Sequence, residues 1–269
     1  MYEEPYRWIE AIGNRRQYLD DQFRQGSPVI GIACDAGILL MTMSKGTPKL
    51  YEIYDRLALG GMGHPADLEK LRFNLLEMAH VEGFNRSPAD VTGSRMVKYG
   101  IAPVIKQAFE EVFKAPFIVK ILLAELGQKA GKDRFLTINF DGTFEEKSQC
   151  AVLASSAAIE QEMMAYLRQQ PVVSLEQAVT AAVYSWAVGD RAQRQVLEES
   201  RNQSEGQVAA VRLASDHDLL HEHVRQCMNG LTIECALLDR HMPGASKYRT
   251  LEPDELERSL PNDLGRPTT

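Results

Sequence analysis

The feature that most constrains this chain is a short hairpin close to its N-terminal end, in residues 29–41. Two apolar runs, VIGIAC and ILLM, flank the tripeptide Asp35-Ala36-Gly37. Asp and Gly between two apolar runs are typical of a tight hairpin turn, and strands without an alternating polar face are buried on both sides. We therefore expect a sheet that other layers of the protein cover on both faces.

Most of the remaining chain repeats apolar residues at helical or strand spacing. Spacings of three and four residues predict helices over 5–24, 64–84, 88–114, 156–169, 174–186 and 253–260. Apolar runs between turn residues predict strands over 49–54, 56–62, 117–126, 231–238 and 248–251, and a second hairpin over 135–146. Because pairs of helices separate blocks of hairpins, we expect layers of sheet with helices packed outside them, and not a doubly wound parallel sheet.

Capping residues mark the ends of two of these helices. Ser87 and Pro88 are typical of a helix start, and Pro103 should kink or divide the helix that follows. Ser174 and Gln177 form a capping-box pattern at the start of the next long helix, which we expect to run through Trp186.

The length of 269 residues is compatible with one large domain, which we place at 1–260. The helix over 5–24 precedes its first strand. Residues 190–229 are polar and rich in Gln, Arg, Glu and His, and they are expected to form a helical insertion on the surface. Residues 261–269 are expected to be a flexible tail.

The charge balance excludes two classes of partner. The formal net charge is −7, whereas nucleic acids and anionic membranes are bound by clustered cationic surface. No stretch reaches the length of apolar sequence that a membrane span needs, and the N-terminus MYEEPYRWIE is acidic. We expect a cytoplasmic protein that binds neither nucleic acid nor membrane.

The sequence offers few candidates for a metal site or a cofactor site. Phosphate-binding, dinucleotide-binding, nucleophile-elbow and zinc-protease motifs are missing. His217 and His221 stand four residues apart and could bind zinc, but a solvated polar face explains them better, so no metal and no cofactor are expected. The four cysteines are scattered and are interpreted as reduced core thiols, with a disulfide as the weaker alternative.

Four segments together resemble the proteasome superfamily, and specifically its bacterial alpha-type subunits. They are GSPVIGIACDAGILLM, TPKLYEIYDRLALGGMGHPADLEKLR, FLTINFDGTFEE and LTIECALLDR. The order of elements agrees with that family from the N-terminal helix to about Leu260. The resemblance implies an α+β fold, a four-layer αββα sandwich of the N-terminal-nucleophile hydrolase type, and assembly of identical subunits into heptameric rings.

The resemblance also implies a non-catalytic function in protein degradation. An alpha-type subunit forms the outer ring of a 20S-like core, caps a ring of beta-type subunits, gates the entry of unfolded protein substrates and docks a ring-shaped ATPase activator. Lys49 matches the lysine whose ammonium binds the activator's C-terminal carboxylate, and Gly26 matches the glycine that lets the tail approach the backbone. Residues 1–4 carry no Tyr-Asp-Arg gate motif.

The alternative is an active, self-processed N-terminal serine hydrolase. Ser27 falls where beta-type members carry the catalytic threonine, so removal of residues 1–26 would leave Ser27 as nucleophile and Lys49 as base. Two features oppose this. The helix over 5–24 is of the kind that alpha-type subunits keep, which leaves Ser27 without a free amine. Residues 40–43 and 225–230 lack the acidic and serine residues that support catalysis in beta-type members.

Overall fold

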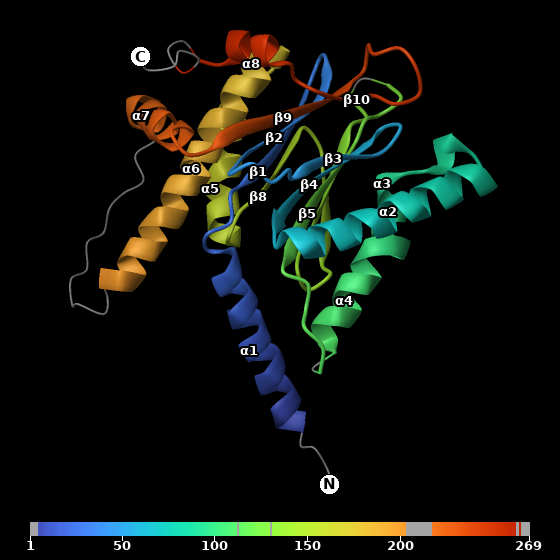
Figure 1. Ribbon diagram of the computed structural model, residues 1–269, viewed down its shortest axis with the longest axis vertical. Coiled ribbons are helices and arrows are strands. Elements are labelled where there is room, and N and C mark those ends of the chain that lie inside the picture. The colour runs from blue at the N-terminus through green and yellow to red at the C-terminus, as the bar shows by residue number, and fades with distance from the viewer. Residues whose placement is uncertain (1–4, 112, 130, 203–216, 262–263, 265–269) are drawn as a thin grey trace.

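The computed structural model describes residues 5–111, 113–129, 131–202, 217–261 and 264. Two five-stranded antiparallel sheets pack face to face, and helices cover the outer face of each (Figure 1). These layers confirm the predicted four-layer αββα sandwich. None of the helices in the described ranges is long and apolar enough to cross a membrane.

The first sheet contains the hairpin from which the sequence prediction began. Its strand order is β10-β9-β2-β1-β8, with β1 (Val29–Cys34), β2 (Gly37–Ser44), β8 (Cys150–Leu153), β9 (Thr232–Asp239) and β10 (Tyr248–Thr250). The turn between β1 and β2 requires glycine at position 37. Its φ is +142°, and a Cβ there would lie 1.9 Å from the carbonyl oxygen of Leu238 on β9.

The second sheet has the strand order β3-β4-β5-β6-β7. Its strands are β3 (Leu50–Tyr54), β4 (Leu57–Gly63), β5 (Val119–Glu125), β6 (Arg134–Ile138) and β7 (Phe144–Lys147). The second predicted hairpin is confirmed as β6 and β7. Side chains of both sheets meet in a dry core that includes Leu40, Leu122 and Phe135. Gly31 makes room for this contact, since a Cβ there would lie 2.7 Å from the Phe135 ring.

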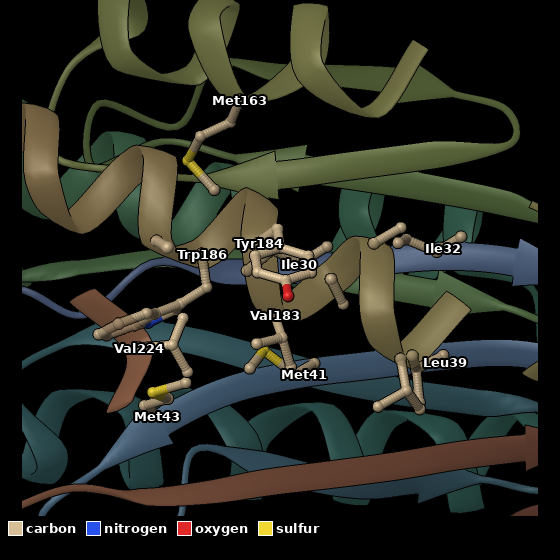
Figure 2. Close-up of a cluster of buried hydrophobic side chains, with 14 of the residues drawn as sticks. Ile30, Ile32, Leu39, Met41, Met43, Met163, Val183, Tyr184, Trp186 and Val224 are labelled. Atoms are coloured by element: carbon tan, nitrogen blue, oxygen red, sulfur yellow. The ribbon is translucent and has the colours of Figure 1, made fainter. Parts of the chain in front are cut away.

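Each sheet has its own helical layer. Over the first sheet lie α5 (Ala157–Arg168) and α6 (Leu175–Asn202), with α7 (His217–Met228) packed on α6. Figure 2 shows Trp186 and Tyr184 of α6 beside Met41 and Met43 of β2, with Val224 of α7 next to them. Over the second sheet lie α2 (Pro65–Asn85), α3 (Gly93–Arg95), the π-helical turn η2 (Met96–Ile101) and α4 (Ala102–Glu110).

Two further helices lie at the ends of the chain. The C-terminal helix α8 (Pro253–Ser259) packs against α6. The N-terminal helix α1 (Pro5–Phe23) extends from one end of the sandwich (Figure 1). Leu19 and Phe23 at its C-terminal end are fully buried in the core between the sheets. The Arg15 guanidinium donates hydrogen bonds of 3.0 and 2.9 Å to the carbonyls of Ala108 and Phe109 on α4. The helix is therefore part of the folded unit.

The helix predicted over 88–114 is the least accurate of the helix predictions. Ser87 caps only the 3₁₀ turn η1 (Pro88–Asp90), and the Thr92 hydroxyl, which accepts from the Arg95 N–H at 3.4 Å, caps the helix that follows. Pro103 lies in the first turn of α4, directly after the π-helical turn. Because proline has no N–H to donate, the hydrogen-bonding pattern changes there.

The helix predicted over 174–186, α6 in the structure, extends well beyond Trp186, its predicted end. It continues to Asn202 because its polar residues beyond Trp186 have partners on α7, which sequence periodicity does not reveal. The predicted insertion at 190–229 thus falls on the end of α6, on α7, and on residues 203–216, which lie outside the described residues. The predicted tail at 261–269 lies almost wholly outside them as well.

Candidate functional site

Gly26, Ser27 and Lys49, the three residues singled out from the sequence, line a single pocket of about 790 Å³. The pocket lies where α1 leads into β1. One wall is the α1–β1 linker, a second is the loop and strand start that carry Lys45 and Lys49, and a third is α6 with the end of α7. Residues up to about 200 positions apart in the chain thus meet at one place.

The linker wall is held by its backbone. The Gly26 N–H donates to the Phe23 carbonyl at 2.9 Å, which ends α1, and the Gly26 carbonyl accepts from the Gln193 side-chain amide at 2.8 Å. A Cβ on Gly26 would lie 2.3 Å from the terminal methyl of Met62. A side chain at position 26 would therefore point into the core. The tight packing of α1 on the second sheet depends on glycine here.

Ser27 is held as a hydrogen-bond acceptor. Its Oγ accepts from the Trp186 indole N–H at 2.8 Å and lies 3.5 Å from the Thr42 hydroxyl. Neither group is a base that could take the serine proton, because the indole N–H only donates and a hydroxyl is a very weak base. Its own amide nitrogen is in the peptide bond to Gly26 and is therefore not a free amine. Ser27 therefore connects the linker to α6.

Lys49 directly precedes β3 and lies next to a half-buried carboxylate. Glu234 of β9 accepts from the backbone N–H groups of Lys49 and Leu50 at 3.0 and 2.9 Å. Burial lowers the pKa of Lys49, and the charge of Glu234 opposes that shift. Burial likewise raises the pKa of Glu234, against the pull of its backbone donors. In the described part of the chain, no group accepts a hydrogen bond from the Lys49 ammonium. An anion entering the pocket could fill that role.

The α6 wall contains residues that sequence reasoning missed. Gln193 is only 4% exposed and joins two segments, since its oxygen accepts from the Ser155 N–H at 2.9 Å while its amide binds Gly26. Asp190, Arg194 and Cys227 line the same wall. These residues were assigned to a surface insertion because their stretch is polar. The spacing of Asp190, Gln193 and Arg194 is the available signal that these three belong to one face of a continuing helix.

The predicted histidine pair has a different role. The His221 ring nitrogen Nδ1 lies 3.1 Å from the Tyr184 hydroxyl, and the ring centroid of His217 lies 4.5 Å from that of Tyr184. Both histidines thus pack around one tyrosine of α6. Among the described residues, the side chains close enough together to hold a metal ion are instead Asp190, His223 and Cys227.

A buried lysine connects the two halves of the sandwich near this site. Lys120 of β5 is 5% exposed, and its ammonium donates to the Ala154 carbonyl at 2.7 Å. The ammonium also lies 5.4 Å from the centre of the Phe23 ring at the end of α1. A single lysine within the apolar stretch FIVKILLAE is the sequence signal that could have indicated it.

Comparison with known proteins identifies the family. The proteasome subunit family model matches residues 23–202. The proteasome subunit alpha of Thermobifida fusca is 25% identical over 256 residues, which cover 93% of this chain and 87% of the relative. That of Jonesia denitrificans is 28% identical over 176 residues, 64% of this chain and 72% of the relative. That of Pseudarthrobacter chlorophenolicus is 30% identical over 153 residues, 55% and 63% of the two chains.

The family match spans most of the chain, and the four-layer sandwich agrees with it. The relatives reported above are all alpha subunits of bacteria. The chain therefore belongs to the proteasome subunit family and is a bacterial alpha-type, non-catalytic subunit.

Proposed function

We propose that this chain forms the outer ring of a 20S-like proteasome core with identical subunits. Membership of the family implies assembly with other proteasome subunits in a ring. In the proposed complex the heptameric ring caps a ring of beta-type subunits that carry the nucleophile, and it restricts entry to unfolded protein substrates in the cytoplasm. The buried C-terminal end of α1 supports this function, because Leu19 and Phe23 hold the helix in place upstream of Ser27.

The proposed ring also docks a ring-shaped ATPase activator in the pocket beside Lys49. One observation carries this proposal: in the described part of the chain the Lys49 ammonium has no hydrogen-bond acceptor, and it borders a pocket of about 790 Å³. A peptide C-terminus supplies the matching group, a carboxylate that accepts charge-assisted hydrogen bonds. Gly26 contributes its backbone to the facing wall, and a side chain at this position would point into the core.

Peptide binding to the assembled ring tests the docking site. The probes are short fluorescent peptides that copy the C-termini of the ring-forming ATPases of the source organism, each with a free carboxylate or a C-terminal amide. We expect Lys49→Gln to weaken binding of the free acid at least about tenfold, or ~1.4 kcal/mol. The amide should bind as weakly to the wild type. Lys45→Gln, at an exposed lysine of the same pocket, is the matched control and should change affinity less than about twofold.

The pH dependence gives the experiment a second readout. Because burial lowers the pKa of Lys49, affinity should fall as pH rises through that lowered pKa, below the range of an ordinary lysine. Lys49→Arg should keep its affinity at the same pH, since arginine stays protonated. Equal binding of acid and amide, or unchanged binding in Lys49→Gln, would refute docking at this site.

Two mass measurements test the assembly and the rival hydrolase. Sedimentation of the chain with its beta-type partner should show a closed ring complex, and a monomer at micromolar concentration would contradict ring formation. The intact mass of the native chain should match the 30.1 kDa sequence, with or without Met1. A mass corresponding to a chain that begins at Ser27 would establish processing. The hypothesis of an outer-ring subunit would then give way to that of the self-processed hydrolase.

A further inference from the structure

Three potential metal ligands converge between α6 and α7, next to the pocket. The Asp190 Oδ2 and His223 Nε2 atoms are 2.8 Å apart, Cys227 Sγ lies 3.6 Å from His223 Nε2, and it lies 3.8 Å from Asp190 Oδ2. His223 and Cys227 are four residues apart on α7, so both project from one face of that helix towards Asp190 on α6. The cluster is well shielded, with side-chain exposures of 14% for Asp190 and 13% for His223.

These separations are close to those of a zinc coordination sphere. Zinc binds carboxylate oxygen, imidazole nitrogen and thiolate sulfur at about 2.0–2.3 Å, so a tetrahedral site places its ligand atoms roughly 3.3–3.8 Å apart. Both separations that involve the Cys227 sulfur already fall in this range. The separation of Asp190 from His223 is that of a hydrogen bond, and it needs to widen by only about half an ångström.

In this structure an arginine side chain supplies the positive charge that a metal ion would bring to the cluster. The Arg194 guanidinium donates to Asp190 Oδ2 at 2.7 Å and to Cys227 Sγ at 3.3 Å. Its side chain is 54% exposed at the edge of the pocket. The arginine can therefore turn into solvent without leaving a buried charge unpaired, and a metal ion would then take its place.

We propose that Asp190, His223 and Cys227 form a binding site for Zn²⁺ that competes with Arg194 and leaves one coordination position open to the pocket. The Cys227 thiol loses its proton to solvent on binding, and the His223 proton resides on Nδ1 so that Nε2 can coordinate. The ion joins α7 to α6 directly beside the wall formed by Gln193 and Trp186. The site does not depend on the docking of an activator.

Cobalt titration of the full chain tests the site, because Co²⁺ replaces zinc in such spheres and a bound thiolate gives a near-ultraviolet charge-transfer band. We expect one equivalent of Co²⁺ to produce the band and one equivalent of Zn²⁺ to abolish it. Cys227→Ser should remove the band and weaken Zn²⁺ binding at least about tenfold. Cys34→Ser, at a half-buried cysteine away from the cluster, is the matched control and should keep both signals.

Two further readouts separate the site from a folding effect. Zn²⁺ should raise the melting temperature of the wild type and of Cys34→Ser, but not that of Cys227→Ser. Arg194→Gln should bind Zn²⁺ several-fold more tightly, because the competing cation is gone. The proposal is overturned if the wild type gives no band, if Cys227→Ser keeps it, or if Arg194→Gln binds Zn²⁺ no more tightly than the wild type.

Discussion

The two helical layers cover their sheets in the same way but differ in their polar groups. On the first sheet, α6 buries polar side chains that bind other segments, including Trp186 and Gln193. On the second sheet, the buried residues of α2 are Leu68, Leu71, Leu75 and Ala79, all apolar. The outward face of α2 instead exposes large apolar side chains, with Phe73 at 60% and Phe84 at 91%.

The difference in buried polar groups shows that the two helical layers have different structural roles. A buried polar side chain must find a partner of fixed geometry, so each such contact specifies where a neighbouring segment lies. The α6 layer therefore positions the α1–β1 linker and builds the pocket. The α2 layer buries only apolar side chains of α2 against its sheet, and its few polar contacts lie at the edges, such as Asp67, which accepts from the Ile118 N–H at 2.9 Å. Its exposed apolar face is available for contacts between subunits.

The largest expected effect is at Trp186, where packing and hydrogen bonding coincide. Trp186 is fully buried and donates to Ser27. Trp186→Ala should lower the free energy of unfolding by about 3–5 kcal/mol in urea titrations, through a cavity and an unpaired linker hydroxyl. Trp8→Ala, at a tryptophan that is 52% exposed, should cost less than about 0.5 kcal/mol. Similar losses in both variants would mean that α6 does not anchor the linker.

The next effect tests whether the polar contacts of the first layer extend to the second sheet. Lys120→Met keeps the side-chain volume but leaves the Ala154 carbonyl without its donor. We expect the free energy of unfolding to fall by about 1–3 kcal/mol. Lys98→Met, at an exposed lysine on η2, is the control and should be within about 0.5 kcal/mol of the wild type. Urea unfolding measures both. A more stable Lys120→Met protein would show that the desolvation of the ammonium costs more free energy than its hydrogen bonds contribute.

A glutamine in each layer allows a direct comparison. Gln193→Leu leaves the Gly26 carbonyl and the Ser155 N–H without their partners. Thermal unfolding should therefore show that the free energy of unfolding falls by about 1–2 kcal/mol. Gln107→Leu changes an exposed residue of α4 and should be close to neutral. If the two substitutions cost the same, the contrast between the layers does not extend to their polar side chains.

The smallest effect on stability should come from the exposed face of α2. Phe84→Ser removes a side chain that is 91% exposed, so the unfolding free energy should change by less than about 0.5 kcal/mol. We expect association with other proteasome subunits to weaken, because the substitution removes exposed apolar surface that a neighbouring subunit could cover. Sedimentation velocity measures the assembled fraction. Unchanged assembly would assign this face to solvent.

Several parts of the fold could be predicted from the sequence because local rules govern them. The hairpin over 29–41 follows from apolar runs and a turn that needs glycine at position 37. The Ser174 cap is confirmed, since its hydroxyl accepts from the Gln177 N–H at 3.3 Å. The division of the helix after Pro88 was harder to place, because Ser87 and Thr92 are equally good caps by composition and only packing decides between them.

In the candidate site, too, some features were suggested by the sequence and others were decided only by the tertiary structure. The roles suggested for Gly26, Ser27 and Lys49 came from resemblance to a family, and the tertiary structure placed them around one pocket. The indole of Trp186 reaches Ser27 across 159 positions of sequence. No periodicity reports such a pairing, because it depends on how α6 lies across β1 and β2.

The sequence by itself determined the alternation of strands and helices, since the spacing of apolar residues sets which faces can be buried. The tertiary structure alone decided that Asp190, His223 and Cys227 meet, and that Lys120 crosses from one sheet to the other. The physical reason is that burial patterns act over a few residues, whereas polar contacts between distant segments are fixed only when the layers pack and bring buried polar groups together.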